Sequence, residues 1–177
     1  MKNIVLSFLA LIVFSACGLG LPEKPENMSD EQYNNEISII QKSEDVINNT
    51  SESSEFPYQA YLNLGQHSEV LLDYETAESS YTKILENTPE DLNVLKSLSS
   101  LYSKTKNKEK ALEVSLKLSQ ASPEDWGIIN DTLQLYVALD QKEAAKLALE
   151  NFIENYPKVK TSDFTSFIAH QRKLLAE

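Results

Sequence analysis

The sequence has little cysteine, glycine, histidine and arginine, and each shortage excludes a class of protein. Cys17 is the only cysteine, so no disulfide can form within one chain. Four glycines and two histidines are present, without a Gly-rich phosphate loop, an H-E-x-x-H motif or a G-x-S-x-G motif. We therefore expect no catalytic site, no metal, no cofactor and no small-molecule substrate.

The balance of charge is strongly acidic. The chain has 27 acidic and 16 basic residues, and Arg172 is the single arginine. Removal of Lys2 with a signal peptide would leave 15 basic side chains and a net charge of −12. Nucleic-acid binding requires clustered Lys and Arg, and attraction to anionic lipid headgroups requires a basic surface. We therefore expect that the protein does not bind nucleic acids and is not held at the membrane by attraction to anionic lipid headgroups.

The first sixteen residues have the layout of an export signal. Lys2 is followed by an apolar run from Ile4 to Phe14 and by the small residues Ser15 and Ala16. The run is too short to span a bilayer comfortably, and the sequence after Cys17 becomes polar within a few residues. We expect cleavage of residues 1–16, although an uncleaved transmembrane anchor is the alternative.

The four residues Phe14-Ser15-Ala16-Cys17 resemble a bacterial lipobox, although the usual pattern has Leu where Phe14 stands. The resemblance implies that Cys17 carries diacylglycerol through a thioether and becomes the new N-terminus, which anchors the protein in the membrane. The alternatives for this thiol are intermolecular pairing or a free thiol. Because Gly18 is not Asp, the resemblance further implies the outer membrane, on its periplasmic face, in a cell that has two membranes.

Residues 17–56 are predicted to be a lipidated acidic tether that is mostly disordered, because they are rich in acids, Asn and Ser. One segment of about 30–48 is expected to be a short amphipathic helix. Ser29 and Gln32 have the spacing of a capping box, and apolar residues follow at helical spacing: Tyr33, Ile37 and Ile40. This helix is interpreted as a loosely packed cap on the domain or as a partner-binding element.

Internal repetition is the strongest pattern in the chain. Two sets of residues recur every 34 positions: Pro89, Pro123 and Pro157, and Ala77, Ala111 and Ala145. The period and pattern resemble the tetratricopeptide repeat, which implies an all-α solenoid of three helix-turn-helix repeats. The expected parts are repeats over 58–91, 92–125 and 126–159, and a capping helix over 161–177.

The repeated residues have simple packing roles. The alanines are expected where two antiparallel helices approach closely, and the prolines are expected to end each second helix, since proline lacks an N–H and disfavours a helical residue before it. Ser115 stands where the pattern usually has an aromatic residue, and the third repeat has Leu133 where a small residue is usual. Local packing at these two positions is expected to differ.

The resemblance implies that the first helix of each repeat lines a groove that binds an extended peptide. The groove positions are rich in amides and hydroxyls, which can both donate to and accept from a peptide backbone. The candidate groove residues are Gln59, Asn63, Gln66, Asn93, Lys96, Ser100, Asn130 and Gln134. The alternative is that these are only soluble surface residues and that partners use another surface.

The sequence therefore predicts a membrane-anchored, non-enzymatic scaffold or adaptor whose partners are proteins or extended peptides of the cell envelope. Machinery for outer-membrane protein insertion, pilus assembly or secretion is the expected setting. Two alternatives stay open: an adaptor that tethers a soluble periplasmic enzyme such as a peptidoglycan hydrolase, and a surface-exposed adhesin.

Overall fold

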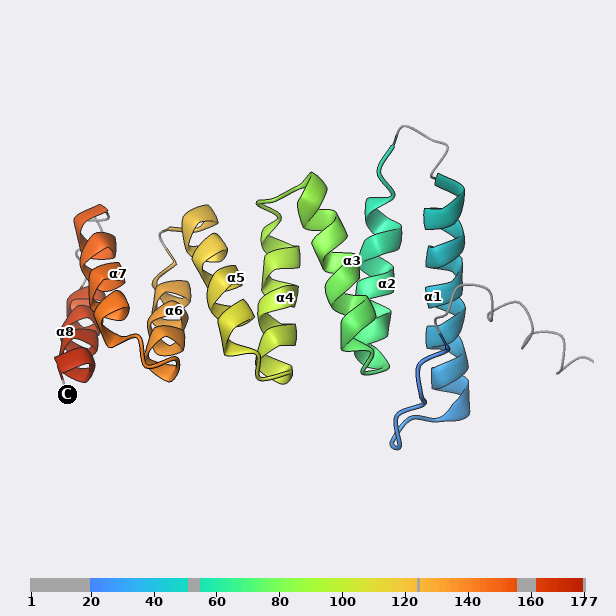
Figure 1. Ribbon diagram of the computed structural model, residues 1–177, viewed down its shortest axis with the longest axis horizontal. Helices are drawn as coiled ribbons and strands as arrows, with labels where there is room; N and C mark the ends of the chain where they lie inside the picture. The colour runs from blue at the N-terminus through green and yellow to red at the C-terminus, as the bar shows by residue number, and fades with distance from the viewer. Residues whose placement is uncertain (1–19, 51–54, 124, 156–161, 177) are drawn as a thin grey trace, which may run out of the picture. The chain divides into compact units, whose positions relative to one another are not determined.

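The computed structural model describes residues 20–50, 55–123, 125–155 and 162–176. The expected signal peptide, Cys17 and Pro157 lie outside the described residues. No residue of the described ranges is in a β-strand. Within these ranges the structure has eight helices (Figure 1): α1 (Asp30–Thr50), α2 (Tyr58–Val70), α3 (Tyr74–Asn87), α4 (Leu92–Lys104), α5 (Lys108–Ala121), α6 (Trp126–Ala138), α7 (Lys142–Asn155) and α8 (Ser162–Ala176).

The helix boundaries reproduce the sequence period. The 13-residue helices α2, α4 and α6 begin at Tyr58, Leu92 and Trp126, and the 14-residue helices α3, α5 and α7 begin at Tyr74, Lys108 and Lys142. Each series advances by 34 residues. The prediction of an all-α fold made of three helix-turn-helix repeats and a C-terminal helix is confirmed.

The chain divides into two compact units, of which the first ends at Ala77 and the second begins at Glu78. In the first unit, α1 packs along α2. Ile37 and Ile40 on α1 form a buried cluster with Leu64 and Leu71 from the α2 region. A helix with one apolar stripe is stabilised mainly by tertiary burial of that stripe, and α2 provides the surface.

Helix α1 is longer and more firmly packed than the composition of the segment predicts. The expected capping box is present: Gln32 N donates to Ser29 Oγ at 3.2 Å, and Ser29 N donates to Gln32 Oε1 at 3.1 Å. The helix continues to Thr50, two residues past the predicted end. Helix α1 therefore takes up two more residues of segment 17–56 than predicted, because a count of polar residues does not reveal that a few buried isoleucines have a partner helix.

In the second unit, consecutive helices from α4 to α8 pack on one another. Ala111 and Ala145 are buried at 3% and 0% exposure, as is Ala77 at 0% in the first repeat. All three repeated alanines are thus buried, and their role at a close helix contact stays a prediction. Pro89 and Pro123 each stand two residues after the end of a second helix, at Asn87 and Ala121.

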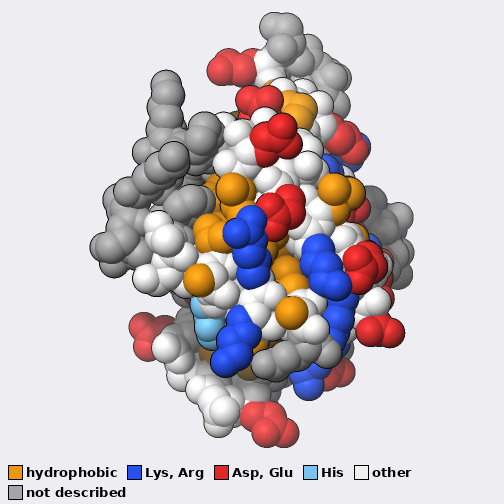
Figure 2. Space-filling view, turned by 90° about the vertical axis from the view of Figure 1, so that its left-hand side faces the viewer, with side chains coloured by type: hydrophobic (Ala, Val, Ile, Leu, Met, Phe, Trp, Pro, Cys, Tyr) orange, Lys and Arg blue, Asp and Glu red, His pale blue; other side chains and the backbone are white. Residues whose placement is uncertain are grey.

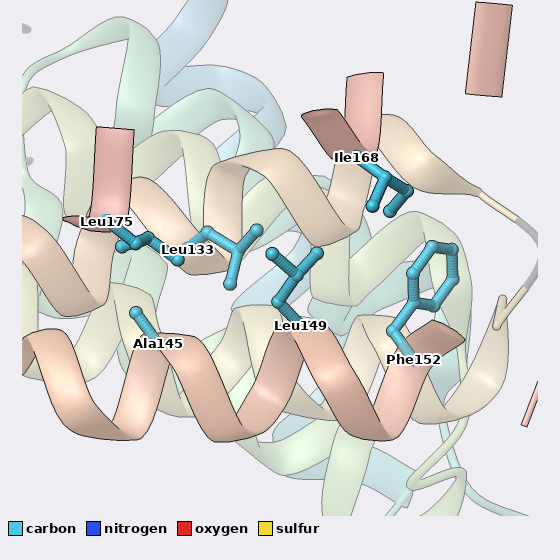
Figure 3. Packing of buried hydrophobic residues seen from close by; sticks show 6 residues of the cluster. All are labelled: Leu133, Ala145, Leu149, Phe152, Ile168 and Leu175. Carbon is cyan, nitrogen blue, oxygen red and sulfur yellow. The ribbon is translucent and has the colours of Figure 1, made fainter. Parts of the chain in front are cut away.

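The last repeat is closed by α8. Leu133 on α6 is buried against Leu149 and Phe152 on α7, with Ile168 and Leu175 of α8 in the same cluster (Figure 3). Leu133 is thus the large residue at a position where a small one is usual, and the side chains of α8 complete its packing. The prediction of a C-terminal capping helix is confirmed.

The other departure from the repeat pattern, Ser115, is balanced by Thr132. Both residues are 3% exposed, and their hydroxyl oxygens lie 2.6 Å apart between α5 and α6. Thr132 Oγ1 also donates to the carbonyl of Ile128 at 2.8 Å. A buried hydroxyl needs a partner, so the two polar residues satisfy one another.

Side-chain caps begin the second and third repeats. The Asp91 carboxylate accepts hydrogen bonds from the N–H groups of Asn93 and Val94, at 3.0 and 3.1 Å. Asp125 caps Gly127 in the same way, at 3.0 Å. The aspartate two residues after each proline therefore satisfies N–H groups that a helix start leaves unpaired, in addition to its favourable charge near the helix dipole.

The turn inside each repeat is a Schellman motif closed by a residue with positive φ that is not glycine. These residues are Leu72, Lys106 and Asp140, with φ of 63°, 57° and 57°. In the second repeat, Asn107 N donates to the carbonyl of Tyr102 at 2.9 Å, and Lys106 N donates to that of Ser103 at 3.3 Å. This pair of bonds defines the motif, and a side chain at positive φ carries a steric cost.

We predict that Lys106→Gly raises the free energy of unfolding by about 0.5 to 1 kcal/mol, because glycine adopts positive φ without that cost while losing more chain entropy. Lys106→Ala keeps a β-carbon and should give no such gain. Urea unfolding followed by circular dichroism measures both. Equal stability of the two variants would contradict the assignment of backbone strain to this turn.

Candidate functional site

The eight candidate groove residues lie on the first helices of the three repeats, as predicted, but they belong to two compact units. Three are on α2 in the first unit: Gln59, Asn63 and Gln66. Five are on α4 and α6 in the second unit: Asn93, Lys96, Ser100, Asn130 and Gln134. Their role in binding stays a prediction.

Most of these side chains are exposed, and only Asn63 and Asn130 are half-buried. Asn93, Lys96 and Ser100 are spaced by three and four residues along α4, which places them on one side of that helix. Their amide, ammonium and hydroxyl groups can meet the carbonyl and N–H groups of a peptide. The polar surface expected from the sequence therefore exists on α4.

Two pairs of amides are already engaged within the protein. Gln59 Nε2 donates to Asn63 Oδ1 at 2.8 Å within α2. Gln171 Nε2 on α8 donates to Asn130 Oδ1 on α6 at 2.9 Å, and Gln171 is only 5% exposed. Asn130 is half-buried because the C-terminal helix brings a buried amide against it.

The contact between α6 and α8 also contains an aromatic pair that the sequence analysis did not anticipate. Trp126 on α6 and Phe167 on α8 have ring centroids 5.3 Å apart and an edge-to-face orientation with an interplanar angle of 77°. Trp126 and Asn130 are four residues apart, as are Phe167 and Gln171. An aromatic residue followed four positions later by an amide, on each of two helices, was the sequence signal that could have indicated this contact. Only the fold shows that the two aromatic residues meet and that the two amides meet.

A hollow of about 340 Å³ lies between α3, α4 and α5 in the second unit. Its apolar lining comes from residues such as Leu85, Leu98 and Val114. Four of its charged groups are paired with one another: Lys110 bonds to Glu78, and Lys117 bonds to Glu113 at 2.8 Å. The candidate groove residues do not line this hollow.

Tyr102 lies in the lining of the hollow. Burial, followed by the neighbouring Glu78 carboxylate and its hydrogen bond, raises the pKa of the Tyr102 phenol. Lys110 stands over the same ring, with Nζ 5.6 Å from the centroid. The phenol therefore stays neutral at physiological pH. Tyr102 contacts Glu78 on α3 and Lys110 on α5.

The side of the second unit formed by α7 and α8 carries mixed charges. Figure 2 shows this side, with Lys and Arg side chains beside hydrophobic ones and Asp and Glu side chains interspersed. Arg172 binds Glu150 on α7 through two hydrogen bonds, at 3.0 and 2.8 Å. The hydrogen bond from Arg172 lowers the pKa of the Glu150 carboxyl. The single arginine thus fastens α8 to α7.

The histidines and carboxylates of the described segments do not form a cluster that could hold a metal ion. His67 Nδ1 lies 2.5 Å from Glu36 Oε2, which joins α2 to α1. Within residues 20–50, 55–123, 125–155 and 162–176, no group of three His, Cys, Asp or Glu side chains is arranged to hold a metal ion. None of the described helices is long and apolar enough to cross a membrane.

Comparison with known proteins gives a structural similarity. No protein-family description matches the chain, and no curated protein sequence matches it either. A solved tetratricopeptide repeat protein from Parabacteroides merdae is similar, with a TM-score of 0.49 and 20% sequence identity. The similarity covers 79% of this chain and 61% of that protein. The fold assignment above rests on the helices of this chain and their 34-residue period.

We predict that Asn130→Ala lowers the free energy of unfolding by about 1 to 3 kcal/mol, because it leaves the buried Gln171 amide without its acceptor. Gln134→Ala is the matched control, one turn further along α6 and exposed, and should stay within about 0.5 kcal/mol of the parent. Urea titration of both variants measures the difference. A loss that is equally small in both would show that the Asn130–Gln171 bond does not hold α8.

Proposed function

We propose that this protein is a lipid-anchored, non-enzymatic adaptor that binds extended segments of other envelope proteins through the exposed side of its first repeat helices. The observation that carries the proposal is the set of exposed polar side chains along α4, Asn93, Lys96 and Ser100, with Gln134 on α6. An extended peptide has unpaired N–H and C=O groups, and such side chains can pair with both.

The repeat architecture supports this role. Each helix pair buries its apolar residues against its neighbours. The exposed side of each first helix therefore does not take part in the packing of the core. Substitutions on that side are expected to change binding with little effect on folding. The paired charges around the hollow between α3, α4 and α5 and the scattered carboxylates favour a binding role over acid-base catalysis.

The membrane anchor is proposed from the sequence around Cys17. Residues 18–29 separate Cys17 from the start of α1, which limits the reach of this segment to about 40 Å when fully extended. The Tyr33 hydroxyl donates to the Pro22 carbonyl at 2.8 Å and shortens the free part further. A lipid on Cys17 would therefore keep the first unit near the membrane surface, which suits an adaptor in the assembly of outer-membrane proteins, pili or secretion machinery.

For the anchor, we predict that Cys17→Ser abolishes incorporation of labelled palmitate and moves the protein out of the membrane fraction or leaves it unprocessed. The reason is that two or three acyl chains supply the membrane affinity, at about 0.8 kcal/mol for each buried CH₂ group. Gly18→Asp is the companion variant: it should stay acylated and, in a cell with two membranes, move to the inner one. A processed, membrane-bound Cys17→Ser protein would overturn the lipid anchor.

For the binding surface, we predict that a photo-crosslinking amino acid at Ser100 captures a protein partner in the native cell, because this exposed side chain lies on the proposed surface. The matched position is Lys106, which is exposed in the turn after α4 and should yield no specific adduct. Mass spectrometry identifies the crosslinked peptide. Adducts from Lys106 but not from Ser100 would reject the first helices as the binding side.

A further inference from the structure

We propose that the partner segment bound by the exposed side of α4 is acidic, with Asp or Glu side chains that contact Lys96 and Lys104. The surface consists of Asn93, Lys96, Ser100 and Lys104, and we call it the α4 row. The inference rests on the proposed function, because it names the chemistry of the segment that α4 binds.

The four side chains of the α4 row lie on one side of the helix. All four are exposed, and they are spaced by three, four and four residues along α4, which is the spacing of neighbours on one helix face. The whole of α4 belongs to the second compact unit. The row is therefore one narrow strip, about 16 Å long at 1.5 Å per residue, which suits a single extended chain.

The second repeat has an excess of positive charge around this strip. Residues 92–112 include five lysines and one acidic residue, Glu109, although acidic residues outnumber basic ones in the chain by 27 to 16. Lys108, at the start of α5, donates from Nζ to the carbonyl of Ala138 at 3.2 Å, a contact in which no carboxylate offsets its charge. An acidic segment is therefore attracted to this part of a protein that elsewhere repels it.

Lys96 has a charge that no carboxylate of the described residues offsets. Several other basic residues form ion pairs: Lys24 with Asp30, Lys83 with Glu86, Lys110 with Glu78, Lys117 with Glu113, Lys146 with Glu143, and Arg172 with Glu150. Lys96 Nζ, in contrast, makes no hydrogen bond or ion pair to any residue that the structure describes. A partner carboxylate can therefore bind Lys96 without displacing a contact of the unbound protein.

An extended acidic segment matches the chemistry of the whole row. In an extended chain, alternate side chains point to the same side, so acidic residues at alternate positions all face the helix. Residues four apart in such a chain are separated by about 13 Å, and Lys96 and Lys104 are separated by about 12 Å along the axis of α4. The amide of Asn93 and the hydroxyl of Ser100 can pair with the peptide N–H and C=O groups.

A single acidic chain suits the row better than an anionic membrane or a nucleic acid does. Both of these present a broad charged surface, which would also meet the acidic side chains of a mature protein with a net charge of −12. A chain that follows α4 is screened from charges more than about 8 Å away at physiological salt. The excess of lysine near α4 can then attract it while the distant acids have little effect.

The lysines of the row are specific to the second repeat. The position of Lys96 is taken by Leu62 in the first repeat and by Asn130 in the third, and Lys104 likewise has no basic counterpart there. Asp131 on α6 is exposed and would repel an acidic side chain. The acidic part of the partner segment should therefore contact α4 and not α6.

The test is a titration of the purified, ¹⁵N-labelled mature protein, in a nonionic detergent, with an end-blocked decapeptide of alternating aspartate and serine. We expect saturable shifts of the backbone N–H resonances of Lys96 and Ser100, with an affinity that falls as added salt screens the charges. The control is an end-blocked decapeptide of alternating asparagine and serine, which has the same length without charge and should give no saturable shift. Blocked ends ensure that only side-chain carboxylates contribute.

The matched variants are Lys96→Ala, Lys96→Arg and Lys106→Ala. Lys96→Ala should bind the aspartate peptide about 2- to 5-fold more weakly, the effect of one exposed ion pair, whereas Lys96→Arg keeps the charge and should keep the affinity. Lys106 is an exposed lysine in the turn beyond α4 and outside the row, so Lys106→Ala should leave the affinity unchanged. The heat-denaturation midpoint checks that each variant is folded.

Three results of the titration would overturn the inference: no saturable shift with the aspartate peptide, an equal shift with the asparagine peptide, or unaltered affinity in a folded Lys96→Ala protein. In the cell, the segment crosslinked at Ser100 should have a net negative charge. A neutral or basic segment would remove the preference for acidic partners and leave the proposed function intact, and a phospholipid adduct would make a membrane the occupant and overturn the inference. Failure of the proposed function is read separately, from the absence of any adduct at Ser100.

Discussion

The structure depends on the burial of one alanine in each repeat. Ala77, Ala111 and Ala145 are at most 3% exposed, and a larger side chain at such a buried position would overpack the core. Because the buried alanines recur every 34 residues, as do the helix starts, the same helix side is buried in each repeat. The polar residues of the first helices can then vary without cost to the core.

Two residues depart from the repeat pattern, Ser115 and Leu133, and other side chains compensate for each of them. Ser115 and Thr132 are each unfavourable as isolated buried hydroxyls, yet together they form a 2.6 Å pair between α5 and α6. Leu133 is too large for the usual contact, and α8 closes around it with Ile168 and Leu175. Both departures lie in the third repeat or at its border, where the array ends and a different neighbour is available.

The same terminal position gives the third repeat its distinct surface. Helix α6 contacts α8, which follows the last repeat. The aromatic pair of Trp126 and Phe167 and the amide pair of Asn130 and Gln171 exist only because of that arrangement. The capping helix therefore completes the core and also gives the third repeat side-chain pairs of its own.

The sequence by itself determined the helical repeats, because proline, alanine and apolar spacing act through local backbone preference and through contacts that recur at a fixed period. The helix boundaries, the capping box of Ser29 and Gln32 and the buried alanines followed from it. The tertiary structure alone decided the packing of α1 on α2, the engagement of Asn130 by Gln171 and the hollow between α3, α4 and α5. Each of these joins residues of different helices, and no periodic pattern in one helix specifies which residue of another will meet it.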